Sequence, residues 1–190
     1  MAILLTGTRD QALLAMVIQE AHQIAKQQRG FVGRTAVQKI MYFLKAIGIP
    51  MDYSFDIYHY GPFADEILRD MEWLQADGVI TDQSQKPDVY SDYAPAQMIQ
   101  ELLDRHSDSL EPLRGKVRNL VQVLIPLRPE RLELLATLDY IYRQERASRA
   151  RGPWKDSVVE RLLQLKGNKF PEKEVEKTYD QMTKAGLTES

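Results

Sequence analysis

The chain has 190 residues, of which 44% are hydrophobic, and a formal net charge of -2. A chain of this length can bury one sizeable core or two small ones, and so small a net charge attracts neither nucleic acid nor an anionic membrane strongly. Because the chain contains no cysteine, it can form no disulfide, thiolate nucleophile or cysteine metal site. A reducing cytoplasm is therefore the expected setting.

The N-terminal segment MAILLTGTRD has no basic run ahead of its apolar residues, so it does not match a signal peptide. No part of the sequence approaches the roughly eighteen continuous apolar residues of a membrane-spanning helix. We therefore expect a cytoplasmic protein that does not enter a membrane.

The first part of the chain is predicted to form two amphipathic helices. Apolar residues recur at helical spacing over residues 10–28, and Gly30 follows where the pattern stops. Thr35 can cap a second helix, which Gly48 is expected to end.

A strand, a third helix and a hairpin are predicted next. Residues 53–60 alternate aromatic or branched residues with polar ones, as in a half-buried strand, and the pair Gly61-Pro62 is expected to end it. A helix is predicted over 63–76, because apolar residues recur there at steps of three and four. Residues 79–81 and 89–93 are expected to pair as a hairpin, which would be the wing of a winged helix.

The remainder of the chain is predicted to be helical. Five helices are expected, at 96–106, 110–125, 129–146, 154–165 and 171–185. The predicted fold is mainly α with a small β-hairpin (α+β), in which a winged helix-turn-helix-like core at 1–94 is followed by a C-terminal helical bundle at 95–190. We expect the two regions to pack as one unit.

Two pairs of segments carry a resemblance to known families. GRTAVQKIMYFLKAIGIP and FDIYHYGPFADEILRDMEWLQADGVI resemble the YwgA-like winged-helix family and, more distantly, the Panacea antitoxin domain. LRPERLELLATLDYIYRQ and KGNKFPEKEVEKTYDQMTKAGL resemble the C-terminal, toxin-binding domain of the DarG antitoxin family. The likeness extends over about residues 33–188.

The resemblance implies an antitoxin-like or accessory domain that holds a toxin inactive. In the DarG family the toxin is the DNA ADP-ribosyltransferase DarT, whose DNA-binding cleft the domain occupies. DarG proteins also carry a macrodomain that removes ADP-ribose from DNA, and this chain has no room for one, so that activity is not implied here.

The residues themselves give no sign of catalysis. The three histidines are far apart in the sequence and have no metal-ligand spacing, and neither a phosphate-binding loop nor a nucleophile motif occurs. Alternation along the predicted strand would place His59 opposite Tyr58 and Tyr60, as a structural residue or as a contact residue. We expect no enzyme activity, no catalytic residue, no cofactor and no metal.

The third predicted helix belongs to an unusually acidic stretch. Residues 33–93 contain five lysines and arginines against ten aspartates and glutamates, a net charge of -5. This sign opposes binding to phosphates, which depends on lysine and arginine at the contact. On a helical wheel one flank of the helix carries Glu66, Asp70, Trp73 and Asp77.

We interpret this flank as a DNA-mimicking surface for a basic, DNA-acting partner protein, with Tyr58, His59 and Tyr60 as further contact residues. The alternative is that the acidic face is ordinary solvated surface, with Trp73 at the edge of the core. The tyrosines at 53, 58, 60, 90 and 93 could likewise line a groove or pack on a sheet.

Two other functions stay open from the sequence. A winged-helix regulator or phage-defence component could bind DNA through Arg34, Lys39, Lys86, Arg146, Arg149 and Arg151. The segment that holds the last three could equally be a linker or a solvated helix end. A homodimer without any ligand is a further possibility.

Overall fold

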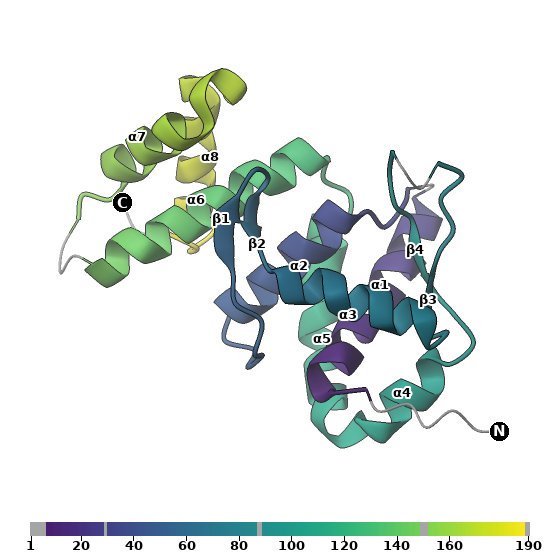
Figure 1. The fold of residues 1–190 in the computed structure, drawn as a ribbon. Coiled ribbons are helices and arrows are strands. Elements are labelled where there is room, and N and C mark those ends of the chain that lie inside the picture. The colour runs from purple at the N-terminus through teal and green to yellow at the C-terminus, as the bar shows by residue number, and fades with distance from the viewer. Residues whose placement is uncertain (1–6, 29, 87–88, 149–151, 189–190) are drawn as a thin grey trace. The chain divides into compact units, whose positions relative to one another are not determined.

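The computed structural model describes residues 7–28, 30–86, 89–148 and 152–188 of the chain. The protein is mainly helical and carries two two-stranded hairpins, as Figure 1 shows. It divides into two compact units. The first contains the chain up to Asp56 together with Phe63–Pro129, and the second contains Ile57–Pro62 together with Glu130–Ser190.

Helix α1 (Arg9–Gln27) is the centre of the first unit. It begins in a capping box, in which the Gln11 backbone N–H donates to the Thr8 hydroxyl at 3.2 Å and the Thr8 N–H donates to the Gln11 side chain at 3.0 Å. Every residue from Ala12 to Ile18 is fully buried, so the helix is enclosed on all sides over this stretch. It contacts α2 (Arg34–Ala46) and α3 (Asp65–Ala76), and the helices predicted there are confirmed. The cap expected at Thr35 is wrong, because α2 begins one residue before it, with Gly33 at its N-cap.

Helices α4 (Ile99–Arg105) and α5 (Ser107–Leu124) also pack on α1. The Glu20 carboxylate of α1, which is 2% exposed, forms ion pairs with Arg114 at 3.1 Å and Arg118 at 3.0 Å, both on α5. The compact unit therefore continues past the boundary predicted at 94/95. Sequence periodicity finds the helices but carries no signal for this distant pairing.

The second hairpin of the chain is formed by β3 (Ile80–Asp82) and β4 (Tyr93–Pro95). The strands are antiparallel, with Asp82 opposite Tyr93. The Asp82 carboxylate accepts the backbone N–H groups of Ser84 and Asp92, each at 2.9 Å, and thereby closes the base of the loop. The second strand was expected at 89–93, yet Val89 and Tyr90 are exposed and pairing begins only at Tyr93.

The first hairpin corrects the prediction of one strand over 53–60. Strand β1 covers only Asp56–Tyr58, His59 and Tyr60 form the turn, and β2 covers Gly61–Phe63. Gly61 has a φ of 84°, a conformation that glycine adopts readily, so Gly61-Pro62 begins a second strand. Because His59 and Tyr60 lie in a turn, the expected alternation of faces does not apply to them.

The second unit is a helical bundle that includes the turn of this hairpin. It is built from α6 (Pro129–Ser148), α7 (Lys155–Lys166), a short 3₁₀ turn (Gly167–Lys169) and α8 (Glu172–Lys184). Its core contains the following side chains: Leu134, Leu138, Ile141, Tyr142, Trp154, Val158, Val159, Leu162, Phe170, Val175, Tyr179 and Met182. None of the described helices combines the length and the apolar character that crossing a membrane would need.

Three buried carboxylates of α6 are each paired with cations of the second unit. Glu133 contacts the Nζ atoms of Lys166 at 2.9 Å and Lys169 at 2.6 Å. Asp139 pairs with Arg143 at 2.6 Å, and Glu145 with Arg161 at 3.0 Å; both of these carboxylates are also buried. Pairing of this kind offsets the free energy that is lost when a charge leaves water.

Candidate functional site

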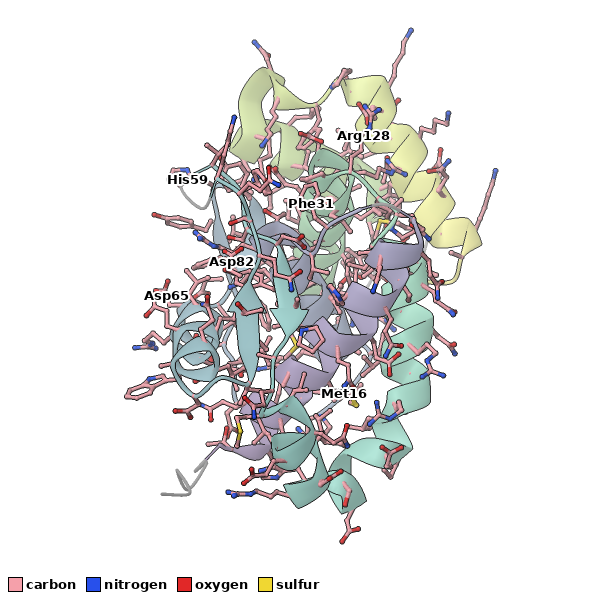
Figure 2. The ribbon with its side chains drawn as sticks, turned by 90° about the vertical axis from the view of Figure 1, so that its right-hand side faces the viewer. Met16, Phe31, His59, Asp65, Asp82 and Arg128 are labelled. Carbon is pink, nitrogen blue, oxygen red and sulfur yellow. The ribbon has the colours of Figure 1, made fainter. Side chains whose placement is uncertain are left out.

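The acidic surface predicted on the third helix is present on α3 in the first unit. Ile67, Met71 and Leu74 of this helix are at most 2% exposed and hold it against the core. Buried residues at steps of four and three define one face of an α-helix, so the acidic residues are directed toward the other faces. In Figure 2, Asp65 lies at the outer edge of the first unit, whereas Met16 of α1 lies inside.

Trp73 is the most exposed aromatic side chain among the described residues, at 64%. Asp65 and Glu72 are also exposed, and Glu66 and Asp77 are half-buried. We call these five residues the acidic face of α3. Within the described part of the chain, no lysine or arginine forms an ion pair with its four carboxylates.

Asp70 differs from its neighbours because both of its carboxylate oxygens are occupied inside the first unit. The Gln11 side-chain amide donates to one oxygen at 2.8 Å, and the Tyr53 hydroxyl donates to the other at 2.7 Å. Burial and the adjacent Asp70 carboxylate raise the pKa of Tyr53 far above its ordinary value, which keeps the hydroxyl protonated as a donor. Asp70 thus links α3 to α1 and to the segment before β1.

The predicted contact residues Tyr58, His59 and Tyr60 belong to the second unit. All three side chains are exposed, and the Tyr58 and His59 rings meet edge to face at 4.5 Å. The turn is held from behind, since Lys166 Nζ donates to the His59 carbonyl at 2.7 Å and Lys169 Nζ lies 4.9 Å from the Tyr60 ring centroid. These residues form an aromatic turn of the second unit, whereas the acidic face belongs to the first unit.

The cations of the DNA-binding alternative are divided between the two units. Lys39 is only 1% exposed, so its predicted contact with phosphate is wrong. Helix α2 is buried around most of its circumference near this residue, and the charge alone did not reveal this. Arg34 and Lys86 are exposed in the first unit.

The DNA-binding alternative also relies on three arginines near the end of the predicted helix 129–146, namely Arg146, Arg149 and Arg151. Arg146 is exposed near the end of α6. Arg149 and Arg151 lie outside the described residues. The basic patch expected around 143–151 therefore stays a prediction.

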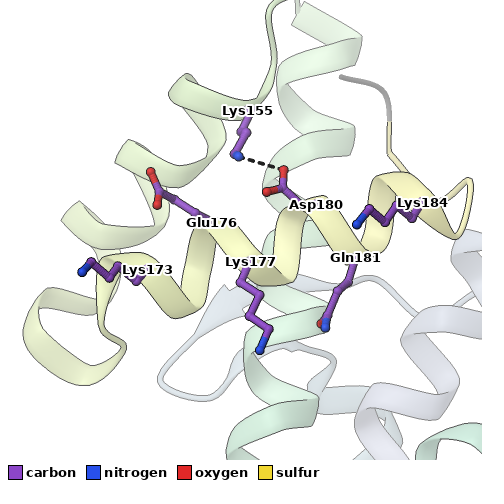
Figure 3. A pocket seen from close by; sticks show the side chains of 7 residues that line it. All are labelled: Lys155, Lys173, Glu176, Lys177, Asp180, Gln181 and Lys184. Carbon is purple, nitrogen blue, oxygen red and sulfur yellow. Dashed lines mark ion pairs between the residues drawn. The ribbon is translucent and has the colours of Figure 1, made fainter.

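A groove that the sequence reasoning missed lies between α7 and α8 of the second unit, as Figure 3 shows. It has a volume of about 340 Å³ and is lined by Lys155, Lys173, Glu176, Lys177, Asp180, Gln181 and Lys184. Lys155 and Asp180 form an ion pair at 2.7 Å, and the hydrogen bond between them raises the pKa of Lys155. A helical wheel of residues 172–184 would have revealed the three lysines of α8 on one side.

The described residues contain no group of three or more histidine and carboxylate side chains that could hold a metal ion. His106 is engaged with the backbone, since its Nε2 atom lies 2.9 Å from the Gly7 carbonyl oxygen. The acidic face of α3 itself offers exposed charge and an exposed aromatic ring.

Comparison with known proteins assigns no relatives: no protein-family model matches the chain, and no curated protein matches it.

Proposed function

We propose that this is a non-enzymatic, antitoxin-like accessory protein that binds and neutralises a basic, DNA-acting protein through the acidic face of α3. The observation that carries the proposal is the exposed Trp73 among four carboxylates that have no cationic partner in the described chain. A lysine- or arginine-rich cleft would supply the missing countercharges.

The spacing of the acidic face suits a protein that ordinarily grips DNA. Glu66, Trp73 and Asp77 follow one flank of the helix at steps of seven and four residues, or about 10 and 6 Å along the axis, which is of the same order as one or two steps between phosphates on a strand. An exposed indole among the carboxylates can occupy the place of a stacked base, because nucleic-acid-binding clefts accept aromatic rings. A DNA-acting toxin, such as a DNA ADP-ribosyltransferase, has the required chemistry.

The order of the elements supports the same proposal. If α2, α3 and the β3–β4 hairpin form a winged helix, α3 is the helix that would enter a DNA groove. Its surface has the wrong sign for that task. The resemblance to the YwgA-like and DarG families points in the same direction, toward the inhibition of a DNA-acting enzyme.

The DNA-binding alternative is weaker than the sequence indicated. Lys39 is buried and so cannot contact a phosphate. Among the described residues of the first unit, the predicted DNA contacts that remain are Arg34 and Lys86. Two lysine or arginine contacts give a shallow dependence on salt, since each neutralised phosphate contributes a slope of only about -0.9.

The test is capture of the partner by the tagged protein from the cells that encode it. The chain should retain a basic DNA-acting protein, and added duplex DNA should release that protein by competition. Replacing Glu66, Glu72 and Asp77 with lysine should weaken the complex by several kcal/mol in total, because like charges would then face each other in a desolvated contact.

A matched control keeps the overall charge change the same. Asp52, Asp104 and Glu160 are exposed and lie outside α3, and their replacement by lysine should leave capture unchanged. Equal losses in the two triple variants would show that net charge alone is responsible, and an unchanged affinity in the α3 variant would refute the proposed surface.

A further inference from the structure

Helix α8 presents lysines in a single row along its exposed side. At 3.6 residues per turn, Lys173, Lys177 and Lys184 lie within an arc of about 40°. Val175, Tyr179 and Met182, which are at most 2% exposed, lie on the opposite side against the core. All three lysines are exposed. We call them the lysine row of α8.

The lysine row borders the groove between α7 and α8, and Figure 3 shows its side chains on that helix together with Lys155 on α7. Four lysines line the groove against the two carboxylates of Glu176 and Asp180, which gives a net charge of +2. Asp180 is already paired with Lys155. Among the residues that line the groove, Glu176 is therefore the remaining unpaired carboxylate beside the lysine row.

On the helical wheel Asp180 falls about 20° and Glu176 about 60° from Lys173, so two acids border the lysine row on one side. Because Asp180 is paired with Lys155, positive charge remains in excess in the groove. The two other acids of α8, Glu172 and Glu174, fall about 100° from the row on either flank of the helix. The groove lining contains no aromatic or aliphatic side chain. A ligand that fits it is therefore anionic and contributes little apolar surface.

The length of the row identifies the class of anion. Lys173 and Lys184 are eleven residues apart, which corresponds to about 16 Å along the helix axis. Duplex DNA carries one negative charge for about every 1.7 Å of its axis, so a row of this length faces several phosphates. Lysine contacts phosphate as a flexible point charge and reads no bases, so binding here would be independent of sequence.

We propose that the lysine row of α8 binds the phosphate backbone of nucleic acid without sequence preference. The site belongs to the second unit and uses none of the residues of the acidic face of α3. Its success or failure is consequently independent of the proposed capture of a basic partner protein.

The test is fluorescence anisotropy of a labelled 24-base-pair duplex across a salt series that begins at about 50 mM. The protein should bind, and the triple variant Lys173→Glu, Lys177→Glu and Lys184→Glu should weaken binding at least tenfold at the lowest salt. The slope of log K against log salt should shrink by about 2.7, since three phosphate contacts are lost. The milder triple change to glutamine should give an intermediate loss if the glutamate variant folds poorly.

A second triple variant supplies the matched control. Lys26, Lys116 and Arg128 are exposed cations of the first unit, and their replacement by glutamate changes the net charge equally. This control should bind the duplex within threefold of the unaltered protein.

Each remaining outcome overturns the proposal. No binding of the duplex at the lowest salt, or equal losses in the two triple variants, would remove it. Tighter binding of polyglutamate than of DNA would assign the row to an acidic protein. Self-association that disappears in the α8 variant, measured by sedimentation, would assign it to a second copy of the chain.

Discussion

The two units of this protein use their carboxylates in opposite ways. In the first unit, the four carboxylates on the acidic face of α3 have no cationic partner within the described chain. In the second unit, Glu133, Asp139 and Glu145 are buried and paired, while the lysine row of α8 faces outward. The acidic face of α3 thus presents negative charge to solvent in the first unit, and the lysine row of α8 presents positive charge in the second.

The comparison teaches that net charge says little about what a region can bind. The chain as a whole is nearly neutral, at -2, yet the position of each charge relative to the core decides whether it is available. Even within the first unit, Glu20 and Asp70 are occupied by internal partners, so they add little to its exposed negative charge.

The largest expected effect concerns the buried charge of the second unit. Glu133→Ala leaves the buried Lys166 amine without its carboxylate and should reduce the free energy of unfolding by about 3–5 kcal/mol. Urea unfolding followed by the fluorescence of the buried Trp154, in a Trp73→Phe background, would report this unit.

The matched control is Glu72→Ala in the first unit. Glu72 is exposed, so its loss should change the free energy of unfolding by no more than about 0.5 kcal/mol. Similar effects of the two substitutions would contradict the contrast between buried and open carboxylates.

A smaller effect is expected at Asp70, which links the acidic helix to α1. Asp70→Ala removes the acceptor of the buried Tyr53 hydroxyl and should destabilise the first unit by about 1–3 kcal/mol. Combining it with Tyr53→Phe should recover part of that loss, because the unsatisfied hydroxyl is then absent. A double-mutant cycle measured by urea unfolding checks this; strict additivity would mean that the two groups do not interact.

The stability of the β3–β4 hairpin should depend on pH through Asp82. Partial burial acts to raise the pKa of Asp82, but the backbone N–H groups of Asp92 and Ser84 outweigh it and lower that pKa below its ordinary 3.8. A lowered pKa in the folded state means that ionised Asp82 stabilises the fold above about pH 4, and that this contribution is lost as the pH falls through the folded-state value.

Asp82→Asn should therefore reduce the free energy of unfolding by about 1 kcal/mol at pH 7, because the hydrogen bonds would then be made to a neutral acceptor. The difference from the unaltered protein should shrink as the pH falls through the lowered pKa of Asp82. Chemical unfolding over a pH series that begins at 7 and descends measures it. A difference that persists at the acid end would exclude ionisation of Asp82 as its cause.

The smallest effect is expected at the centre of the acidic face. Trp73 is 64% exposed, so Trp73→Ala should alter the free energy of unfolding by less than about 0.5 kcal/mol. The same substitution should weaken capture of the partner, because an exposed tryptophan is a typical binding hot spot. A decrease of more than about 1 kcal/mol in the free energy of unfolding would mean that Trp73 contributes to the stability of the fold.

Local periodicity predicted most of the helices, because their apolar residues recur every three or four positions. It did not predict the turn at His59 and Tyr60, since Gly61-Pro62 fits both a strand break and the start of a second strand. It also misplaced Lys39, whose helix is buried on more than one face. Charge alone is a poor guide to exposure in such a helix.

The candidate site was predicted less completely than the fold. Helical spacing placed Glu66, Trp73 and Asp77 around the same side of α3, which local geometry determines. The role of Asp70 depends on Gln11 and Tyr53, which are 59 and 17 residues away. Contacts of that kind depend on tertiary packing, as does the division into units that places α5 with α1.

The turn of the first hairpin has a consequence for how this protein can be divided. Its residues 57–62 lie in the second unit although the segments on both sides belong to the first, so the chain passes between the units three times. A fragment that begins at Glu130 would lack the His59 carbonyl that accepts from Lys166 and the Tyr60 ring beside Lys169. A cut at that boundary would therefore leave the second unit without one of its own segments, so the isolated C-terminal fragment should be less stable than the same helices in the whole chain.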